Sequence, residues 1–408
     1  MDTSEQIEID DARRMVLETL ARLPATTVDL DEALARVIDE DVLAQEPLPP
    51  FDSSAMDGFA VRADDLTRPA RLRVVGESRA GAPARVALGT GQAIAISTGA
   101  MIPAGADAVV RVERTRRENG VVHVLAPVAA GAEVRRAGED VRAGSTVIGR
   151  GTTLGPAELG MLAALGRARV SCTRAPRVSV LVTGDELLAA AEHARAGAIR
   201  DSNSHSIAAL ARCAGAQVQR SVAVPDDAAS TRAAIADAVE DSDVVIVCGG
   251  VSVGEHDHVR SSLHALGARR AFWGLALKPG HPTWFGTLHD KPVFGLPGNP
   301  VSAMVTFVLL AAPALRAMQG AAPARDRVTA ALEDGYTKPA GRAHALRCML
   351  SAREDGWHAR ATGAQGSHVA SSMLAADALA IVPSASTALA PGARVEIVPL
   401  RAWMSPWP

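Results

Sequence analysis

Three glycines and two acids stand in one short segment, GGVSVGEHD at residues 249–257, which directly follows the apolar run DVVIVC. Glycines let backbone N–H groups approach an anion closely, and carboxylates such as Glu255 and Asp257 can hold a divalent cation. A glycine-rich loop between a buried strand and a helix is a weak signal alone. Its weight depends on the turns that accompany it.

Four other unusual turns also follow predicted strands. In an open parallel sheet, ligands bind in the crevice beyond the carboxyl ends of the strands. We therefore expect all five turns to line one rim and to form one pocket. The four are TGDE at 183–186, PDD at 225–227, LKPGHP at 277–282 and GLPGNP at 295–300.

The chemistry of this rim is mixed. Glycine N–H groups and the positive end of a helix beginning near Val301 favour an anion. Carboxylates beside a phosphate-type ligand would repel it unless a divalent cation lies between them, and Mg²⁺ commonly bridges carboxylates and phosphate oxygens. The turns predict a Mg²⁺-assisted phosphate site. Its acids are Glu186, Asp226, Asp227, Glu255 and Asp257.

Each acid also has a simpler interpretation, because a lone acid after a strand is often a turn residue or a helix cap. The recurrence of acids on one rim favours the ligand site over this alternative. His256 and His258 flank Asp257, but alternating loop residues converge poorly on a transition metal, so exposed loop histidines are the better interpretation.

Lysine is rare in this chain. Arginines are numerous, whereas the lysines are Lys278, Lys291 and Lys338. A compact ammonium suits point contact with an oxyanion, and Lys278 before PGHP is the lysine for which we expect this role. In GLPGNP, Pro297 and Pro300 stiffen a turn whose Gly298 and Asn299 tolerate left-handed backbone.

Several elements must position these residues. Short apolar strands alternating with helices over 175–325 predict a mostly parallel sheet covered on both faces. Outside it we expect helices at 8–23 and 28–45, a small β domain at 55–135, a helix entered through Pro156 at 152–166, and short strands over 326–400.

The composition excludes some classes of protein. The chain has 408 residues, a net charge of −3 and a pI of about 6.4, so no overall basic field draws in nucleic acid. Its four cysteines lack metal or disulfide spacing, the N-terminus resembles no signal peptide, and the apolar run VSAMVTFVLLAA is shorter than the ~20 residues of a membrane span. We expect a cytoplasmic protein that binds neither nucleic acid nor membrane.

Nine segments together carry a resemblance to a known family, the molybdopterin molybdenumtransferases (the MoeA proteins and the gephyrin E domain). It spans almost the whole chain and is weakest in the C-terminal region. In order, the segments are PPFDSSAMDGFAV, STGAMIPAGADAVV, RRAGEDV, TGDEL, SNSHSIAAL, GGVSVGEHD, LALKPGHP, GLPGNPVSA and GSHVASSM.

The resemblance implies a multidomain α/β plus β fold. Its parts would be a doubly wound, MogA-like α/β domain at 1–25 with 175–325, a discontinuous helical linker and dimerisation domain at 26–54 with 136–174, an inserted small β domain at 55–135, and a C-terminal β-barrel at 326–408.

The resemblance also implies a reaction: molybdenum from molybdate is inserted into adenylyl-molybdopterin, AMP is released and Mg²⁺ assists. The residues carried over as catalytic are Asp57, Asp140, Glu186, Asp226, Asp257 and Lys278. Of these, Glu186, Asp226 and Asp257 are the implied metal ligands. Those carried over as substrate-binding are Thr98, Gly249, Gly250, Ser252, Gly254, His281, Pro297, Gly298, Asn299, Pro300, Arg347, Ser367 and Ser371.

The implied partners are a second copy of the chain, molybdopterin adenylyltransferase and recipient molybdoenzymes. In a homodimer whose cleft lies near the interface, Asp57 would act on the rim of the partner subunit.

The sequence departs from the family pattern at three positions. His281 stands where KPGKP has its second lysine, while Arg200 and His258 stand where tyrosine is common. A histidine is only partly charged near neutral pH, so anion affinity would fall or depend on pH.

Two other functions stay open from the residues. A non-catalytic dimeric scaffold has no need of clustered pocket charge, which argues against it. A Mg²⁺-dependent hydrolase of another nucleotide would use the same α/β fold.

Overall fold

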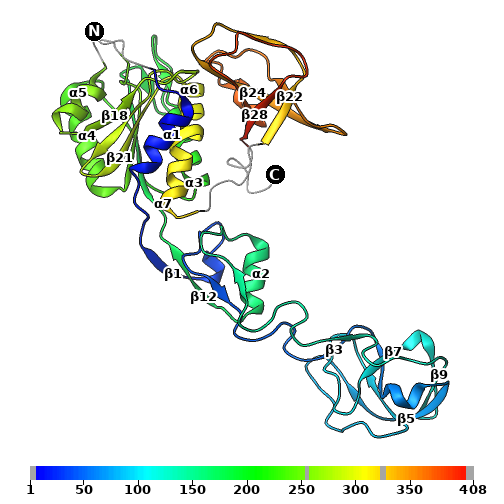
Figure 1. Cartoon of the computed structure of the whole chain (residues 1–408). Coiled ribbons are helices and arrows are strands. Elements are labelled where there is room, and N and C mark those ends of the chain that lie inside the picture. The colour runs from blue at the N-terminus through cyan, green and yellow to red at the C-terminus, as the bar shows by residue number, and fades with distance from the viewer. Residues whose placement is uncertain (1–5, 253–256, 322–327, 401–408) are drawn as a thin grey trace.

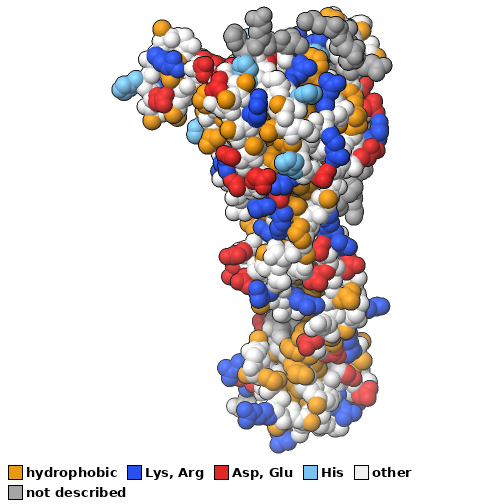
Figure 2. Space-filling view, turned by 90° about the vertical axis from the view of Figure 1, so that its left-hand side faces the viewer, with side chains coloured by type: hydrophobic (Ala, Val, Ile, Leu, Met, Phe, Trp, Pro, Cys, Tyr) orange, Lys and Arg blue, Asp and Glu red, His pale blue; other side chains and the backbone are white. Residues whose placement is uncertain are grey.

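The computed structural model describes residues 6–252, 257–321 and 328–400. The molecule is elongated, with the α/β part and the C-terminal barrel at one end, a slender middle, and a separate β unit at the other end (Figure 1). On the face shown in Figure 2, acidic and basic side chains are interspersed along its length.

The α/β part is built on one sheet in the order β16-β13-β17-β21-β20-β18. The first four strands run parallel, and β20 and β18 add antiparallel pairings at one edge. The strands are β13 (Arg177–Thr183), β16 (Gln217–Val224), β17 (Val244–Cys248), β18 (Arg269–Trp273), β20 (Trp284–Leu288) and β21 (Lys291–Leu296). Beside the sheet, β14 (Leu187–Leu188) pairs with β15 (Ile199–Arg200).

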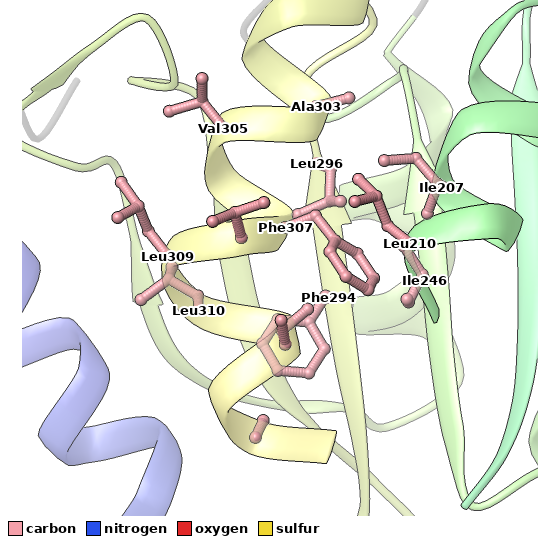
Figure 3. Close-up of a cluster of buried hydrophobic side chains, with 14 of the residues drawn as sticks. Ile207, Leu210, Ile246, Phe294, Leu296, Ala303, Val305, Phe307, Leu309 and Leu310 are labelled. Carbon is pink, nitrogen blue, oxygen red and sulfur yellow. The ribbon is translucent and has the colours of Figure 1, made fainter. Parts of the chain in front are cut away.

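Helices cover both faces of this sheet, as expected for a doubly wound fold. One core cluster joins the sheet to α1 (Ile9–Glu18), α3 (Asn203–Cys213) and the helical run formed by α6 (Pro300–Thr306), π-helical η4 (Phe307–Ala311) and α7 (Ala312–Met318). The other joins it to α4 (Ala228–Asp241) and α5 (His258–Ala265). In Figure 3, Phe294 and Leu296 of β21 pack between the helical run α6–η4–α7 and Ile207 of α3.

The helical run from Pro300 to Met318 is longer than the sequence predicts. It has 19 residues and a mean hydropathy of 1.8, so its length and composition would suffice to cross a membrane. In this structure 78% of its most apolar window is buried inside the protein.

The middle of the molecule has little helix. The predicted helix at 28–45 is wrong: this stretch contains the end of β1 (Ala25–Asp29), a turn of 3₁₀ helix η1 (Leu30–Glu32) and β2 (Val42–Leu43). These strands pair with β12 (Arg169–Thr173) and β11 (Thr146–Ile148), far away in the sequence. The predicted helix entered through Pro156 is confirmed as α2 (Pro156–Ala164).

The distal β unit holds a sheet in the order β7-β4-β6-β5-β9-β8. Its strands are β4 (Gly58–Val61), β5 (Ala70–Ser78), β6 (Gln92–Ile96), β7 (Ala108–Arg111), β8 (Thr115–Glu118) and β9 (Val121–Val124), with 3₁₀ turns η2 (Ala63–Leu66) and η3 (Val112–Arg114). At its entry, β3 (Ser53–Ser54) pairs with β10 (Val134–Arg135).

The C-terminal strands close into a barrel. Each strand pairs with the next in the spatial order β24-β25-β22-β28-β26, and β26 pairs back with β24. These are β22 (Val328–Leu332), β24 (Ala343–Arg353), β25 (Gly356–Ala361), β26 (Ala378–Val382) and β28 (Arg394–Pro399). The short elements are β23 (Tyr336–Thr337), β27 (Ala388–Leu389) and α8 (Ser371–Leu374). The barrel meets the α/β part where β19 (Leu277–Lys278) pairs with β24.

An ion pair connects the start of the sheet to the middle of the molecule. The Arg174 guanidinium donates to both oxygens of Asp243 at 2.5 and 2.9 Å, and the backbone N–H of Arg177 donates to the same carboxylate at 2.8 Å. Burial of the Asp243 carboxyl raises its pKa, but these hydrogen bonds outweigh burial and hold the pKa well below its usual range.

We expect Asp243→Ala to lower the free energy of unfolding by about 2–3 kcal/mol at pH 7, because it leaves Arg174 without its partner. The folded-state pKa is lowered, so this stabilisation is present above the unfolded pKa of about 4 and is lost as the pH falls below it. Calorimetry at pH 7 and near pH 3 checks both points.

Asp241→Ala is the matched control, because Asp241 pairs with Arg220 at the surface, where an ion pair contributes only ~0.2–1 kcal/mol. Equal losses in the two variants at pH 7 would contradict the account of Asp243.

Candidate active site

The turns after four parallel strands converge because the strands end level with one another. Thr183 pairs with Val224, Val182 with Cys248, and Cys248 with Leu296. The chain runs from β13 outward to β16 and then returns to the other side for β17, so the β13–β17 boundary is the topological switch point, where ligands bind in such sheets.

A cavity of about 470 Å³ lies at this switch point, and we call it the acidic cavity. Its carboxylates are Glu186, Asp201, Asp226 and Asp257. The predicted residues Gly249, Gly250, Ser252, Pro297, Gly298, Asn299 and Pro300 also line it.

Two glycines in the wall of this cavity are required by the backbone. Gly249 has φ +92°, and a Cβ there would lie 2.9 Å from the carbonyl oxygen of Thr183. Gly250 has φ +62°, and its Cβ would lie 2.7 Å from Val259. Side chains at either position would be strained and would also close the approach of a ligand to the loop backbone.

Asp226 and Asp227 have different surroundings. Asp227 caps α4, because its Oδ1 accepts the N–H groups of Ala229 and Ser230 at 2.9 and 2.8 Å. Asp226 is left to face the acidic cavity, and its own N–H donates to Oδ1 of Asp185 at 3.0 Å. Asp185, which sequence reasoning did not single out, therefore fixes the turn that carries Asp226.

The carboxyl of Asp226 lies in an unfavourable place for a negative charge. Its Oδ1 is buried and has no hydrogen-bond partner among the described residues. Burial raises the pKa of Asp226, and His258 opposes this effect. The nearby carboxylates that raise it further are Asp185, Glu186 and Asp257. A cation bound beside Asp226 would offset both the cost of burying its negative charge and the repulsion from the nearby carboxylates.

Asn203, at the start of α3, is a second buried group in this cavity that sequence reasoning did not assign. Its Nδ2 donates to the carbonyl of Gly298 at 2.7 Å, which ties α3 to the GLPGNP turn. Its Oδ1 is buried and has no partner within the described part of the chain. The sequence signal that could have identified Asn203 is the DSN segment at 201–203, at the start of a predicted helix.

A second cavity of about 490 Å³ lies between the α/β part and the barrel, and we call it the cationic cavity. Its charged or ionisable lining residues are Lys278, His281, Tyr336, Arg342, His344, Arg347 and His368, and no Asp or Glu lines it among the described residues. Both cavities share Pro282, Pro297 and Asn299. The expectation of one pocket is therefore corrected to two adjoining cavities, since Lys278 and His281 face the barrel instead of the acids.

Arg347 places a buried charge in this second cavity. The residue is 1% exposed, and its guanidinium donates to Ser372 Oγ and to the carbonyls of Ala345 and Gly366 at 3.2–3.4 Å. No carboxylate pairs with it in the described ranges. Burial lowers the pKa of Arg347. A buried guanidinium without a carboxylate favours binding of an external anion.

His281 is held by its own turn. Its Nδ1 lies 2.9 Å from the carbonyl oxygen of Leu275, which can only accept, so Nδ1 carries the proton. In the neutral ring, Nε2 is then an acceptor and donates to an anion only after protonation. The ring also lies 6.1 Å from Trp273, centroid to centroid.

Some predicted residues lie away from both cavities. Asp57 and Thr98 contact each other in the distal β unit, where Asp57 Oδ1 accepts the Thr98 N–H at 2.7 Å. Asp140 is exposed near the entry to that unit, and Ser371 is exposed at the start of α8. Within one chain the distal unit lies at the opposite end from the sheet (Figure 1). Ser367 lines the cationic cavity. Gly254, Glu255 and His256 lie outside the described residues.

The carboxylates do not form a ready-made cage. The described residues contain no group of three or more His, Cys, Asp or Glu side chains placed to hold a metal ion together. Mg²⁺ usually binds through one or two carboxylates plus waters and substrate phosphates. The buried oxygens of Asp226 and Asn203 are hard ligands of the kind that Mg²⁺ prefers, so the donor set fits a cation that arrives with a phosphate ligand.

The fold and the two cavities define a class: a multidomain α/β protein with an acidic cavity at the switch point of its sheet and a cationic cavity against a β-barrel. Three family models match it, the MoeA N-terminal region (domain I and II) at residues 7–166, the probable molybdopterin binding domain at 179–317, and the MoeA C-terminal region (domain IV) at 329–400.

Relatives match along the whole chain. A molybdopterin molybdenumtransferase of Haemophilus influenzae is 36% identical over 96% of this chain and 98% of its own length, and one of Bacillus subtilis is 33% identical over 97% and 94%. The crystal structure of the MoeA protein of Pyrococcus horikoshii superposes with a TM-score of 0.83 at 32% identity, covering 96% of this chain and 99% of that one.

The chain belongs to the MoeA family of molybdopterin molybdenumtransferases. It is a transferase of molybdenum cofactor biosynthesis, and the predicted family, fold class and enzyme class are confirmed.

Proposed function

We propose that this enzyme inserts molybdenum from molybdate into adenylyl-molybdopterin, with release of AMP and with Mg²⁺ bound at the acidic cavity. The observation that carries this proposal is the pair of adjoining cavities with opposite charge. The two substrates need different surroundings, because adenylyl-molybdopterin carries a phosphoanhydride and molybdate is a bare dianion. The wall that the two cavities share places an acidic and a cationic site next to each other.

The cationic cavity suits molybdate. Molybdate is a tetrahedral dianion, and cationic side chains and backbone donors bind such oxyanions well. Lys278, Arg347 and Ser367 line the same cavity from three segments of the chain, and its described lining contains no acid. The ammonium of Lys278 and the buried guanidinium of Arg347 hold and orient the oxyanion beside the shared turn.

The acidic cavity suits the adenylate end of the other substrate. Glu186, Asp226 and Asp257 are the residues that would hold Mg²⁺, with Asn203 as a further oxygen donor. When bound there, Mg²⁺ would neutralise phosphate charge and polarise the phosphoanhydride. The loop at Gly249 and Gly250 brings backbone close to the ligand, and the GLPGNP turn forms the wall between the two substrates.

We propose a homodimer as the working form. Asp57 and Thr98 form a hydrogen-bonded pair on the distal β unit, far from the cavities of their own chain. Family resemblance assigns functional roles to Asp57 and Thr98. From the distal β unit, they would act on the partner subunit's cavity. We further propose cytoplasmic location and contacts with molybdopterin adenylyltransferase and recipient molybdoenzymes, which supply the substrate and accept the product.

One departure from the family pattern gives a direct prediction. Replacing His281 by lysine should raise molybdenum insertion at pH 7.5 about 3-fold or more. Neutral His281 presents an acceptor to an oxyanion, whereas an ammonium donates at all relevant pH values. Initial rates of cofactor formation at limiting molybdate measure the effect. His281→Gln is the control, and a clear loss in His281→Lys would show that the histidine has a function of its own.

The proposed reaction is tested by incubating the purified protein with adenylyl-molybdopterin, Mg²⁺ and molybdate while following AMP and molybdenum cofactor. Release of AMP together with cofactor formation supports the proposal. AMP without metal insertion would indicate a nucleotide hydrolase, and no AMP at all would indicate a scaffold.

A further inference from the structure

Tyr336 and His344 form a hydrogen-bonded pair in the wall of the cationic cavity. His344 lies in β24 opposite Lys278 in the β19–β24 pairing, and both residues line the cationic cavity. His344 is 6% exposed, and its Nδ1 lies 2.8 Å from the Tyr336 hydroxyl. The two rings meet edge to face, with 5.7 Å between their centroids.

The surroundings decide which atom of this pair carries each proton. Burial raises the pKa of Tyr336, so the hydroxyl keeps its proton and can donate it, and we assign it as the donor to His344 Nδ1. Burial, and then the charges of Lys278, Lys338 and Arg342, lowers the pKa of His344 to about 4, so the imidazole is neutral near pH 7. A neutral ring that accepts at Nδ1 carries its proton at Nε2.

The opposite assignment conflicts with an anion in the cavity. If Nδ1 carried the proton, the Nε2 lone pair would be the group left for the cavity, where it would repel a bound oxyanion. Nε2 has no hydrogen-bond partner in the described part of the chain, so it is available to a ligand. His344 is thus the reverse of His281, whose Nδ1 donates to a carbonyl and whose neutral Nε2 accepts.

We propose that His344 is an oxyanion-binding residue and that Tyr336 is its positioning residue, holding the imidazole as a neutral Nε2–H donor to molybdate. The inference rests on the proposed binding of molybdate in the cationic cavity. A neutral donor strengthens the grip on the anion without adding another buried positive charge beside Lys278 and Arg347. Unlike the donation from His281, this donation does not require protonation.

The first test measures molybdate binding alone by titration calorimetry at pH 8, without the pterin. His344→Leu removes the donor, and we expect its Kd to rise about ten-fold, as for loss of a hydrogen bond to a charged group. His344→Gln keeps an amide N–H near the position of Nε2, so its Kd should stay within about three-fold of the wild type. Thermal melts of both variants check the fold.

The second test separates positioning from a purely structural role. Tyr336→Phe leaves Nδ1 without its donor, so we expect molybdate affinity to fall about five-fold at pH 8.5. The deficit relative to wild type should shrink toward pH 4, near the pKa of His344, because a protonated imidazole carries Nε2–H regardless of Nδ1. Taking the ratio to wild type at each pH cancels the contributions of the other groups around the ring, which are Lys278, His281, Lys338, Arg342, Arg347 and His368.

The outcomes are distinct. If wild type binds molybdate and His344→Leu binds it equally well, the inference fails while the proposed function stands. A Tyr336→Phe deficit that is the same at every pH overturns the positioning role. If the wild type does not bind molybdate, the proposed function itself fails, and the inference fails with it.

Discussion

Lys278→Met should lower the rate of molybdenum insertion about 100-fold at limiting molybdate. Lys278 is one of three lysines in the chain, it lines a cavity whose described lining has no acid, and its pairing with β24 fixes its backbone. Removing a charged donor to a desolvated dianion typically costs about 2–3 kcal/mol, which corresponds to this factor. Methionine keeps most of the length of the side chain without the charge, so packing changes little.

Lys291→Met is the matched control, because the Lys291 ammonium donates to backbone carbonyls at the end of α4, away from both cavities. It should insert molybdenum at the wild-type rate. AMP release by Lys278→Met in the absence of molybdate should stay within about three-fold of the wild type, since the adenylate site is the other cavity. Equal insertion rates in Lys278→Met and wild type would remove Lys278 from the mechanism.

Asp226→Asn should lower AMP release by two to three orders of magnitude. The change keeps the size of the side chain but removes the negative charge of the carboxylate. Oδ1 of this carboxylate is buried without a partner among the described residues. Loss of a group that stabilises the reacting charge in a closed site costs about 2.7–4 kcal/mol. The Mg²⁺ concentration needed for half-maximal AMP release should rise as well.

The neighbouring acid provides the control. Asp227 caps α4, and asparagine caps a helix about as well as aspartate, so Asp227→Asn should retain AMP release and stability. The two variants differ by one position and remove the same charge. If both lose AMP release equally, the effect comes from net charge at the rim and not from a ligand role of Asp226.

The sequence predicts the rim well, because the rule for parallel sheets needs only the order of strands and turns. The turns at Gly184, Asp226, Gly249 and Gly298 do line one cavity, since the strands before them end level with one another. It could not separate the LKPGHP turn from the acids. That separation depends on β19 pairing with β24, more than 60 residues later in the chain.

Two kinds of feature were beyond sequence reasoning for the same reason. Residues 28–45 look helical locally, but pairing of β1 with β12 at the start of this stretch and of β2 with β11 near its end overrides that propensity. Tyr336 lies in the short strand β23 and His344 in the barrel strand β24, with no motif around either, and only their contact at the cavity wall gives them significance. Local pattern predicts elements and turns, whereas long-range strand pairing decides which side chains share a cavity.

The central claim is that molybdate and the adenylate occupy adjoining cavities of opposite charge. The most direct measurement is the position of molybdenum in crystals grown with molybdate, located by its anomalous scattering. We predict a peak in the cationic cavity, within hydrogen-bonding reach of Lys278, Arg347 and Ser367. A peak in the acidic cavity, or none in the cationic cavity at saturating molybdate, would contradict this account.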